Sequence, residues 1–347
     1  MKKRLILYVL WEKNGEVCDF VAYSLEQYRA FAGDVLVIAN GGLSERGRRR
    51  LSDIGVRYLE RENTGLDFAA WKAAMEHEGW EKLTALDELI LTNCSCYGPI
   101  FPLQEVFERM EPDACDFWGM TRHPDADINV IPEDPATRIV SHLQSYFLVF
   151  RQSAIRSDCF RRWWETLVPA AAYWEEVGYH EVPFTRYLEQ GGLRAATYYS
   201  DARSVDVNPT LFADVEQVRE RRVPFIKVKM FHDFLPFYAR AERTDIPWRL
   251  MDLMENHTAY PTETIWRNMA EKNGYCSRPL PDAALGNEAA VVQLSFYGEH
   301  MKLLLNAPAG KPVTAHCGGK IYKSTQCIES KYVAWGGAWR AAATADC

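Results

Sequence analysis

Short apolar runs of four to seven residues recur along this chain, and each is followed by a segment in which apolar residues return at helical spacing. This alternation is typical of parallel strands that are covered on both faces by helices. The predicted strands are Leu5 to Trp11, Val35 to Ala39, Val56 to Leu59, Leu89 to Thr92, Asp116 to Met120 and Tyr146 to Arg151. We therefore expect an α/β fold with a mostly parallel sheet flanked by helices.

Helices are predicted between these strands wherever an apolar stripe or a helix-end signal is present. Proline suits a first helical turn, where its missing N–H has no partner to lose, and glycine suits a helix end. The predicted helices are Cys18 to Tyr28, Ser44 to Leu51, Asp67 to His77, Leu103 to Met110, Ser153 to Leu167 and one that enters at Pro183 and ends at Gly191-Gly192.

The pattern changes after about residue 286. Ala289 to Leu294 is expected to form a strand and Glu299 to Leu305 a helix, whereas the tail from Ala307 has no clear period. The expected organisation is a main α/β domain over residues 1–285 and a short C-terminal extension over residues 286–347, the stub of a further module.

Charge and hydropathy narrow the class of protein. With 40 basic and 47 acidic residues the formal charge is -7, which gives no long-range attraction for a polyanion, so broad nucleic-acid binding is disfavoured. No stretch approaches the roughly 18 to 20 apolar residues that span a bilayer, and the start of the chain lacks a signal-peptide cleavage site. We expect a cytoplasmic protein whose membrane contact, if present, is peripheral.

The nine cysteines occur in an odd number, without any C-x-x-C pair, and several lie inside apolar runs. These features favour reduced thiols over a disulfide framework or a zinc site.

Polar segments follow three of the predicted strands at the point where each strand ends. They are Asn40-Gly41-Gly42, Glu62 to Asp67 and Asn93 to Pro99. Each segment alone can be a turn or a helix cap. Together they share the edge of the sheet at which α/β proteins bind nucleotides. The chain contains no G-x-G-x-x-G after its first strand and no P-loop, which disfavours a dinucleotide enzyme or a P-loop NTPase.

Several ordered blocks of this sequence resemble the rhamnan synthesis protein F family over roughly Lys3 to Met269. The blocks are Asn63 to Phe68 with Trp71-Lys72, Asn93 to Pro102, Asp116 to Thr121, His142 to Phe147 and Pro224 to Lys227. Ordered blocks are more specific than a single motif. The resemblance implies a GT-A-like, Rossmann-type fold and transfer of L-rhamnose from a dTDP donor to a cell-surface polysaccharide.

The polar segments at the strand ends, together with the resemblance, indicate which residues face the nucleotide-sugar donor. The expected donor-binding residues are Asn40, Asn63, Gly65, Asp67, Asn93, Ser95, Tyr97, Gly98 and Lys227. Lys227 is expected to stabilise the departing diphosphate, because a cation can offset the charge that develops there.

A divalent cofactor, Mg²⁺ or Mn²⁺, is implied for related GT-A enzymes, in which an Asp-x-Asp motif after the fourth strand holds the metal. The similar family block often reads Asn-Asp-Ser, but here it is Asn93-Cys94-Ser95. A thiol is a poor ligand for these oxygen-preferring ions, which puts metal dependence in doubt. Asp67 and His232 are the remaining candidate ligands.

An inverting transfer needs a base that accepts the proton of the acceptor hydroxyl. In GT-A enzymes this base often lies at the start of a late helix, so Glu181 is the expected base and His180 its rival. Glu181 could instead be an ordinary first-turn glutamate that complements the helix dipole. His142 and Gln144 are expected to contact sugar hydroxyls, and Trp118 either stacks on a sugar or packs in the core.

Three functions are open at this point. The first is an inverting rhamnosyltransferase that acts on a polysaccharide or lipid-linked glycan at the inner face of the cell membrane. The second is a GT-A transferase for another nucleotide sugar, because residue types alone do not fix the sugar. The third is a catalytically lapsed glycan-binding module, suggested by Cys94.

Overall fold

The computed structural model describes residues 2–199, 215–231, 246–265, 267–268, 290–295, 301–306, 313–317, 320–324 and 333–334. The chain divides into two compact units, Met1–Lys227 and Val228–Cys347. The first unit carries every predicted site residue except His232, which lies outside the described residues.

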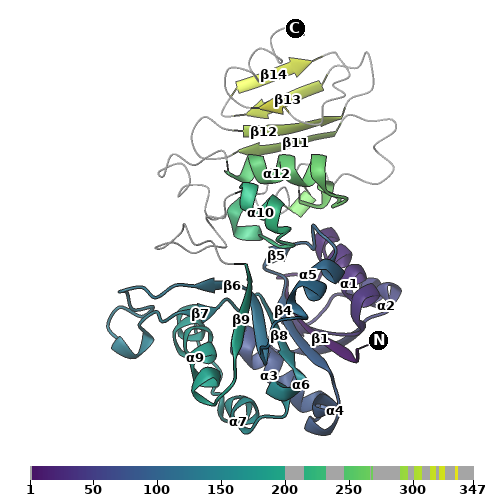
Figure 1. Ribbon diagram of the computed structural model, residues 1–347. Helices are drawn as coiled ribbons and strands as arrows, with labels where there is room; N and C mark the ends of the chain where they lie inside the picture. The colour runs from purple at the N-terminus through teal and green to yellow at the C-terminus, as the bar shows by residue number, and fades with distance from the viewer. Residues whose placement is uncertain are drawn as a thin grey trace. The chain divides into compact units, whose positions relative to one another are not determined.

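The first unit is built on an eight-stranded sheet with the order β3-β2-β1-β4-β8-β6-β7, in which β9 also pairs with β6 (Figure 1). Strands β3, β2, β1 and β4 are mutually parallel, and β8 is antiparallel to β4. The predicted α/β class with a mostly parallel sheet flanked by helices is therefore confirmed. The strands are β1 (Arg4–Trp11), β2 (Gly33–Asn40), β3 (Arg57–Arg61), β4 (Glu88–Asn93), β6 (Phe117–His123), β7 (His142–Leu143), β8 (Phe147–Arg151) and β9 (Ala195–Tyr199).

Helices cover both faces of this sheet, as the apolar pattern predicts. Alternate residues of β1 point to opposite faces. Leu5 and Leu7 pack in the same core as Trp71 of α3, while Tyr8 contacts Tyr28 of α1 at a ring distance of 5.8 Å. The helices in this part of the chain are α1 (Asp19–Ala32), α2 (Glu45–Ile54), α3 (Leu66–Glu78), α4 (Trp80–Thr84) and α5 (Leu103–Met110).

The predicted helix over Ser153 to Leu167 is wrong as a single element, because it is split into α6 (Gln152–Ile155) and α7 (Asp158–Thr166). The Ser157 hydroxyl accepts a hydrogen bond from the Phe160 backbone N–H at 3.3 Å and so begins a new helix. Serine is a preferred helix N-cap because its oxygen satisfies a donor that the first turn leaves open.

The helix expected to enter at Pro183 begins ten residues earlier and is continuous through three segments. They are α8 (Tyr173–Glu176), the π-helical turn η2 (Val177–Glu181) and α9 (Val182–Gln190). A proline inside an α-helix removes one i→i−4 hydrogen bond, and the π turn just before Pro183 changes the bonding pattern there. The predicted end at Gly191 is confirmed, since Gly191 is the C-cap of α9.

A separate two-stranded ribbon joins distant parts of the first unit. Strand β5 (Cys96–Tyr97) pairs antiparallel with β10 (Ile226–Lys227), so that Lys227 lies opposite Cys96. The short helix α10 (Val215–Arg221) precedes β10 in the chain. This ribbon is the element that brings residue 227 to the end of β4.

The second unit contains η3 (Val228–Phe231), α12 (Ile246–His257) and strands β11 (Ala290–Ser295), β12 (Met301–Asn306), β13 (Val313–Cys317), β14 (Lys320–Ser324) and β15 (Val333–Ala334). The strand predicted over Ala289 to Leu294 is confirmed, but the helix predicted over Glu299 to Leu305 is wrong, because β12 pairs antiparallel with β11. A short apolar run fits a strand as well as a helix, and here the neighbouring strand decides. The separate extension over residues 286–347 stays a prediction.

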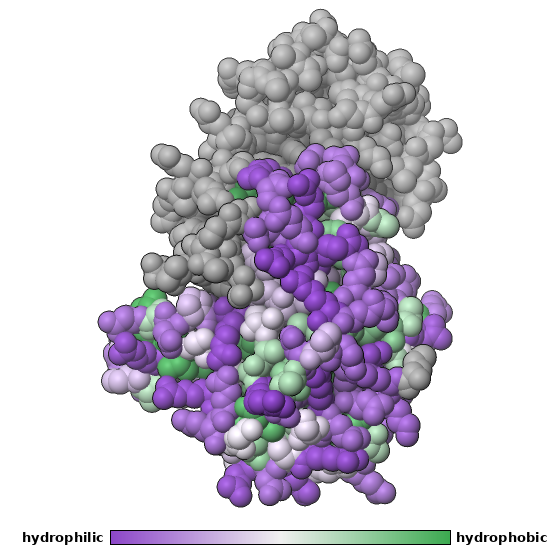
Figure 2. Space-filling model, in the orientation of Figure 1, coloured by the Kyte–Doolittle hydropathy of each residue, from purple (hydrophilic) through white to green (hydrophobic). Residues whose placement is uncertain are grey.

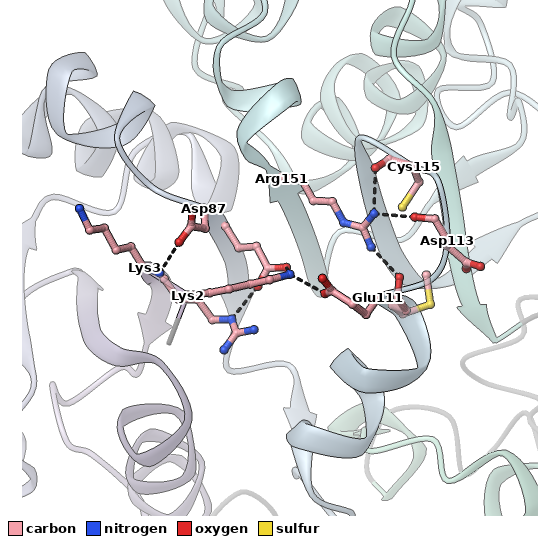
Figure 3. A network of polar contacts seen from close by, with 10 residues as sticks. Lys2, Lys3, Asp87, Glu111, Asp113, Cys115 and Arg151 are labelled. Atoms are coloured by element: carbon pink, nitrogen blue, oxygen red, sulfur yellow. Dashed lines mark hydrogen bonds and ion pairs between the residues drawn. The ribbon is translucent and has the colours of Figure 1, made fainter.

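A polar network lies at the sheet end opposite to the carboxyl ends of the parallel strands (Figure 3). Buried Glu88 at the start of β4 accepts hydrogen bonds from Arg4 at 2.6 Å and Lys2 at 3.1 Å. Arg151, the last residue of β8, donates to the backbone carbonyls of Met110, Asp113 and Cys115. These contacts fasten the start of β1 to the start of β4 and secure the chain that follows α5.

The surface of the described residues is mainly hydrophilic on the face that Figure 2 shows, with small hydrophobic patches between polar regions. Within the described residues, no helix has the length and apolar character needed to cross a bilayer. Within the described residues, Cys96, Cys115 and Cys159 form no disulfide bond.

Candidate functional site

Four polar side chains form a hydrogen-bonded chain at the carboxyl end of β4. Asn93 Nδ2 donates to Asp67 Oδ2 at 2.7 Å. The Ser95 hydroxyl donates to Asn93 Oδ1, and Lys227 Nζ donates to Ser95 Oγ at 3.0 Å. The sequence predicts that all four residues lie near the donor. In the structure they are joined to one another by hydrogen bonds.

Three elements position this chain of side chains. Asn93 is the last residue of β4, which pairs with β1 in the centre of the sheet, and Asp67 lies in the first turn of α3. Lys227 arrives from β10, whose pairing with β5 sets it opposite Cys96 and beside Ser95. The Lys227 ammonium also lies 4.4 Å from the centre of the Tyr146 ring, in a cation–π contact.

Asp67 is a carboxylate whose proton is held unusually tightly. Desolvation raises the pKa of Asp67 to about 6, although the Asn93 hydrogen bond and the Lys227 charge lower it. The charge of Glu181 raises the pKa of Asp67 further, which means that Glu181 lies within electrostatic reach of the chain of four side chains. At neutral pH Asp67 is mostly ionised and lies within electrostatic reach of Lys227.

Glu176 is a buried carboxyl group that our reading of the sequence did not single out. Its Oε1 accepts the Phe68 backbone N–H at 2.9 Å, and the Asp67 backbone N–H also bonds to it. The N-cap of α3 is Gly65, which has no side chain that could accept these N–H groups. Glu176 therefore caps α3 from another helix. Burial, followed by the charge of Asp67, raises the pKa of Glu176 to about 8. Nothing in the local pattern around residue 176 marks a buried carboxyl group.

Glu181 ends the π-helical turn and is fixed by a neighbouring loop. Its Oε1 accepts the Ser145 backbone N–H at 3.3 Å and lies 4.0 Å from His142 Nε2. Glu181 is therefore not a first-turn glutamate, because the helix begins at Tyr173. The carboxylate instead belongs to the group of charges around Asp67.

His142 is buried behind Glu181 and stacks on His123 with ring centres 5.3 Å apart. His142 Nδ1 donates to the Val140 carbonyl at 2.6 Å, which leaves Nε2 toward Glu181. Burial lowers the pKa of His142, while the Glu181 charge opposes this effect. The expected contact of His142 with sugar hydroxyls stays a prediction, and in the structure His142 is a neighbour of Glu181.

His180, the rival base, is turned into the core. Its ring lies 5.6 Å from the ring of Phe68, and burial lowers its pKa. In the described part of the chain its Nδ1 has no hydrogen-bond partner, although the Val168 backbone bonds to the residue. This position favours Glu181 over His180 as the group that meets an acceptor.

Asn40 and Gly65 shape the loop that leads into α3. Asn40 Nδ2 donates to the Leu66 carbonyl at 3.2 Å, and Arg61 donates to Asn40 Oδ1 at 2.6 Å. Gly65 has a φ of +69°, and a Cβ there would lie 2.5 Å from Pro169 Cβ. Asn63 is exposed on the same loop. Of these residues, Asn63 alone presents an exposed side chain; Asn40 and Gly65 fix the backbone.

Other expected site residues lie in the core. Tyr97 is fully buried, with its ring 5.0 Å from that of Phe20, and Trp118 packs on Phe107 at 5.0 Å. Apolar burial of such large rings excludes them from a wet cleft, so the expected contacts of Tyr97 with the donor and of Trp118 with a sugar are not supported by their positions.

Gln144 and Gly98 also contact other parts of the protein. Gln144 is buried and accepts a hydrogen bond from the Thr121 hydroxyl at 2.8 Å. Gly98 has a φ of +139°, and a Cβ there would lie 2.4 Å from the Pro224 carbonyl oxygen. Gly98 thus permits close approach of the chain before β10.

The donor set at the end of β4 does not fit a divalent metal ion. Asn93 directs its N–H group at Asp67, the ammonium of Lys227 bonds to Ser95, and position 94 is a thiol whose Sγ lies 3.7 Å from the Trp11 carbonyl oxygen. Mg²⁺ and Mn²⁺ require several oxygen ligands that face one point. Across the described residues, no group of three or more His, Cys, Asp or Glu side chains is arranged to hold a metal.

Comparison with known proteins gives one family. The family model described as rhamnan synthesis protein F matches residues 35–286 of this chain. No curated protein matches the sequence.

Solved structures resemble the chain only distantly. A candidate nucleotide-diphospho-sugar transferase from Desulfovibrio desulfuricans G20 is 13% identical, with 57% of this chain and 80% of that chain covered and a TM-score of 0.31. Glucosyl-3-phosphoglycerate synthase from Mycobacterium tuberculosis is 13% identical, with 45% and 59% covered and a TM-score of 0.31. A cytidylyltransferase from Leptospira borgpetersenii is 10% identical, with 75% and 100% covered and a TM-score of 0.36. The fold assignment rests on the strand order described above.

Proposed function

Because the chain belongs to the rhamnan synthesis protein F family, we propose that this glycosyltransferase moves L-rhamnose from dTDP-rhamnose onto a polysaccharide or lipid-linked glycan, with inversion at the anomeric carbon. The observation that best supports this proposal is the hydrogen-bonded chain from Asp67 through Asn93 and Ser95 to Lys227. It supplies a cation at the sheet edge where α/β proteins bind nucleotides.

Lys227 stabilises the leaving group in this proposal. When the bond between the anomeric carbon and the diphosphate oxygen breaks, its electron pair passes to the diphosphate. An ammonium group beside that oxygen offsets the new charge, and it is most effective when its position is fixed in advance. The bond to Ser95 and the contact with the Tyr146 ring fix Lys227 in this way.

Glu181 acts as the base. The acceptor hydroxyl oxygen bonds to the anomeric carbon from the face opposite the diphosphate, and its proton passes to the Glu181 carboxylate. The Ser145 N–H holds Glu181 Oε1, which orients the group for this transfer. The reaction balances without an added reactant: dTDP leaves, and one proton moves from acceptor to enzyme and then to solvent.

The donor and the glycan acceptor are the partners of this reaction. Rhamnan synthesis on lipid-linked intermediates would take place at the inner face of the cell membrane, so the proposed location is cytoplasmic with peripheral membrane contact.

Replacement of the base gives the first prediction. Glu181→Gln keeps the side-chain shape and the Ser145 contact but cannot accept a proton, so kcat should fall by about 10²- to 10⁴-fold. The measurement is transfer from dTDP-rhamnose to a short rhamnan acceptor, without added metal. Glu189→Gln is the matched control on the same helix, because Glu189 pairs with Arg122 and has no part in the proposed chemistry.

A glycan-binding module without activity is the second candidate, and the presence of Cys94 in place of an acidic residue favours it. Turnover by the wild-type protein without added metal would reject it. Equal activity of the wild type and Glu181→Gln would show that Glu181 is not the base.

A further inference from the structure

Exposed aromatic side chains gather on one short segment of the first unit. Among the described residues, the exposed large hydrophobic side chains are Trp11, Tyr58, Ile128, Val168, Tyr173, Trp174 and Tyr179. Four of these seven lie between Val168 and Tyr179. Single exposed apolar residues need no explanation, but a concentration of them on a wet surface indicates a binding site.

Tyr173 and Trp174 form the part of this segment that lies next to the reactive groups. Trp174 is 60% exposed and Tyr173 48% exposed, and their ring centres are 4.9 Å apart at an interplanar angle of 69°. Both residues open α8, whose Glu176 bonds to the backbone at the start of α3. The pair is therefore fixed to the same helix start that carries Asp67.

The Tyr173 hydroxyl lies within electrostatic reach of the charged groups of the site. Burial raises the pKa of this hydroxyl, and Glu181 adds to the rise. Lys227, Glu176 and Asp67 act on the same hydroxyl through their charges. The ring of Tyr173 thus has one end near the catalytic cluster and an exposed surface.

The π-helical turn explains why residues 173 and 181 lie near each other around the helix. In a regular α-helix of 3.6 residues per turn, a spacing of eight residues leaves the two side chains about 80° apart around the axis. The i→i+5 bonding of η2 winds less per residue over Val177–Glu181, which brings Glu181 back toward the face of Tyr173. Functional sites often contain such turns.

We propose that Tyr173 and Trp174 form the acceptor subsite, where an apolar face of an acceptor sugar ring stacks on the exposed aromatic rings and presents its hydroxyl to Glu181. This inference rests on the proposed function, because Glu181 is the group that defines where the acceptor must lie. Pyranose rings carry C–H groups on their faces, and aromatic rings bury such surface while their polar ends stay hydrated.

The charges around the pair favour a neutral glycan over a lipid surface. α8 contains Glu175 at its surface but no Lys or Arg, and the whole chain carries a formal charge of -7. Helices that bind membrane surfaces are usually rich in Lys and Arg, because the cytoplasmic leaflet is anionic. A neutral sugar meets no such repulsion.

The direct test is calorimetric binding of a rhamnose tetrasaccharide to the full chain. Trp174→Ala should weaken binding by about tenfold or more, and Trp174→Phe should restore most of it. Tyr58→Ala is the matched control, since it removes an exposed aromatic ring from β3 and should change nothing. Thermal unfolding of each variant verifies that the fold is retained.

Steady-state transfer gives a second readout. Trp174→Ala should raise the KM for the tetrasaccharide about tenfold while leaving the KM for dTDP-rhamnose unchanged. An unchanged acceptor KM and unchanged calorimetric affinity would overturn the subsite, and the proposed function would still stand if transfer continues. Absence of transfer by the wild type would reject the proposed function, whereas the calorimetric result would still test the subsite.

Sedimentation with vesicles tests whether the exposed aromatic pair binds lipid and not a glycan. Binding to phosphatidylcholine or phosphatidylglycerol vesicles that Trp174→Ala abolishes, together with an unchanged affinity for the tetrasaccharide, would overturn the proposal. Vesicle binding that is the same for wild type and Trp174→Ala, with weakened saccharide binding, supports it.

Discussion

Lys227 brings a positive charge to the carboxyl end of β4. Its ammonium bonds to Ser95, and Ser95 bonds to Asn93. The sequence could predict Lys227, because it ends an apolar run inside a block shared with the family. It could not predict Glu176, because burial of a carboxyl group in a polar helical stretch depends on which helix start it meets in the fold.

Removal of the Lys227 charge is the second prediction. Lys227→Met keeps the length of the side chain but removes its charge, so kcat/KM should fall by about 10²- to 10³-fold. Lys227→Arg should recover part of this loss, because the positive charge remains. The comparison is made by initial rates at several donor concentrations. A loss in Lys227→Arg as large as that in Lys227→Met would mean that shape, and not charge, matters at this position.

The proton on Glu176 leads to a third prediction, about stability and pH. The folded state raises the pKa of Glu176 from 4.5 to about 8, so the folded protein holds a proton that the unfolded chain releases in between. The free energy of unfolding should therefore decrease as pH rises from about 4.5 to 8, by at most about 1.4 kcal/mol per pH unit for this group. Its stabilising contribution is complete below that range and lost above it.

Glu176→Gln tests this prediction, because the amide oxygen can still accept the Phe68 N–H but cannot ionise. The variant should lose less stability than the wild type between pH 5 and 8, as measured by urea unfolding at each pH. Glu189→Gln serves again as the control. Parallel curves for the wild type and Glu176→Gln would exclude Glu176 as the source of the pH dependence.

At the scale of elements, strands were predicted well and their long-range partners were not. Continuous apolar runs specified β1, β2 and β4, because strands buried on both faces contain few polar residues. The ribbon of β5 and β10 has only two residues in each strand, which is too short for any periodic pattern. The helix predicted over the run at β12 is wrong for a related reason, since an apolar run of that length has no decisive period.

The fourth prediction concerns the ribbon. Gly98→Ala would place a Cβ 2.4 Å from the Pro224 carbonyl oxygen, at a φ of +139°. The chain before β10 must then move, and Lys227 should move away from Ser95. We expect about 1 to 3 kcal/mol of destabilisation and a loss of kcat/KM similar to that of Lys227→Met.

Gly79→Ala is the matched control for Gly98→Ala. Gly79 also has a positive φ, +80°, but no atom lies within 4 Å of the added Cβ. Gly79→Ala should lower the free energy of unfolding by about 1 kcal/mol through backbone strain alone, and it should leave transfer activity unchanged. An active Gly98→Ala enzyme would show that the ribbon does not position Lys227.

At the scale of the first unit, one end of the sheet carries the candidate site and the other end carries a polar network. The register sets Trp11 opposite Asn40 and Val9 opposite Asn93, so the parallel strands end together at the candidate site. The network in Figure 3 fastens the other end. This division follows from strand direction and could be predicted from the sequence; the identity of the sugar could not, because it depends on the shape of the site.

The donor preference is the fifth prediction and involves the stability of the whole chain. A ligand that binds only the folded state stabilises it by about 2.7 kcal/mol at a concentration 100 times its Kd. Saturating dTDP-rhamnose should raise the Tm, whereas UDP-glucose at the same concentration should raise it much less. A larger shift with UDP-glucose would reassign the donor while leaving the transferase fold unchanged.

The contact between Lys227 and Ser95 joins positions that are 132 residues apart in the chain. During synthesis the parallel strands β1 to β4 can pair long before residue 227 leaves the ribosome, because their partners are close in sequence. The β5 and β10 pairing must instead close a long loop, which makes it a late step of folding. A nascent chain can thus bury its core while still unable to hold a diphosphate, so catalytic competence comes later than compactness.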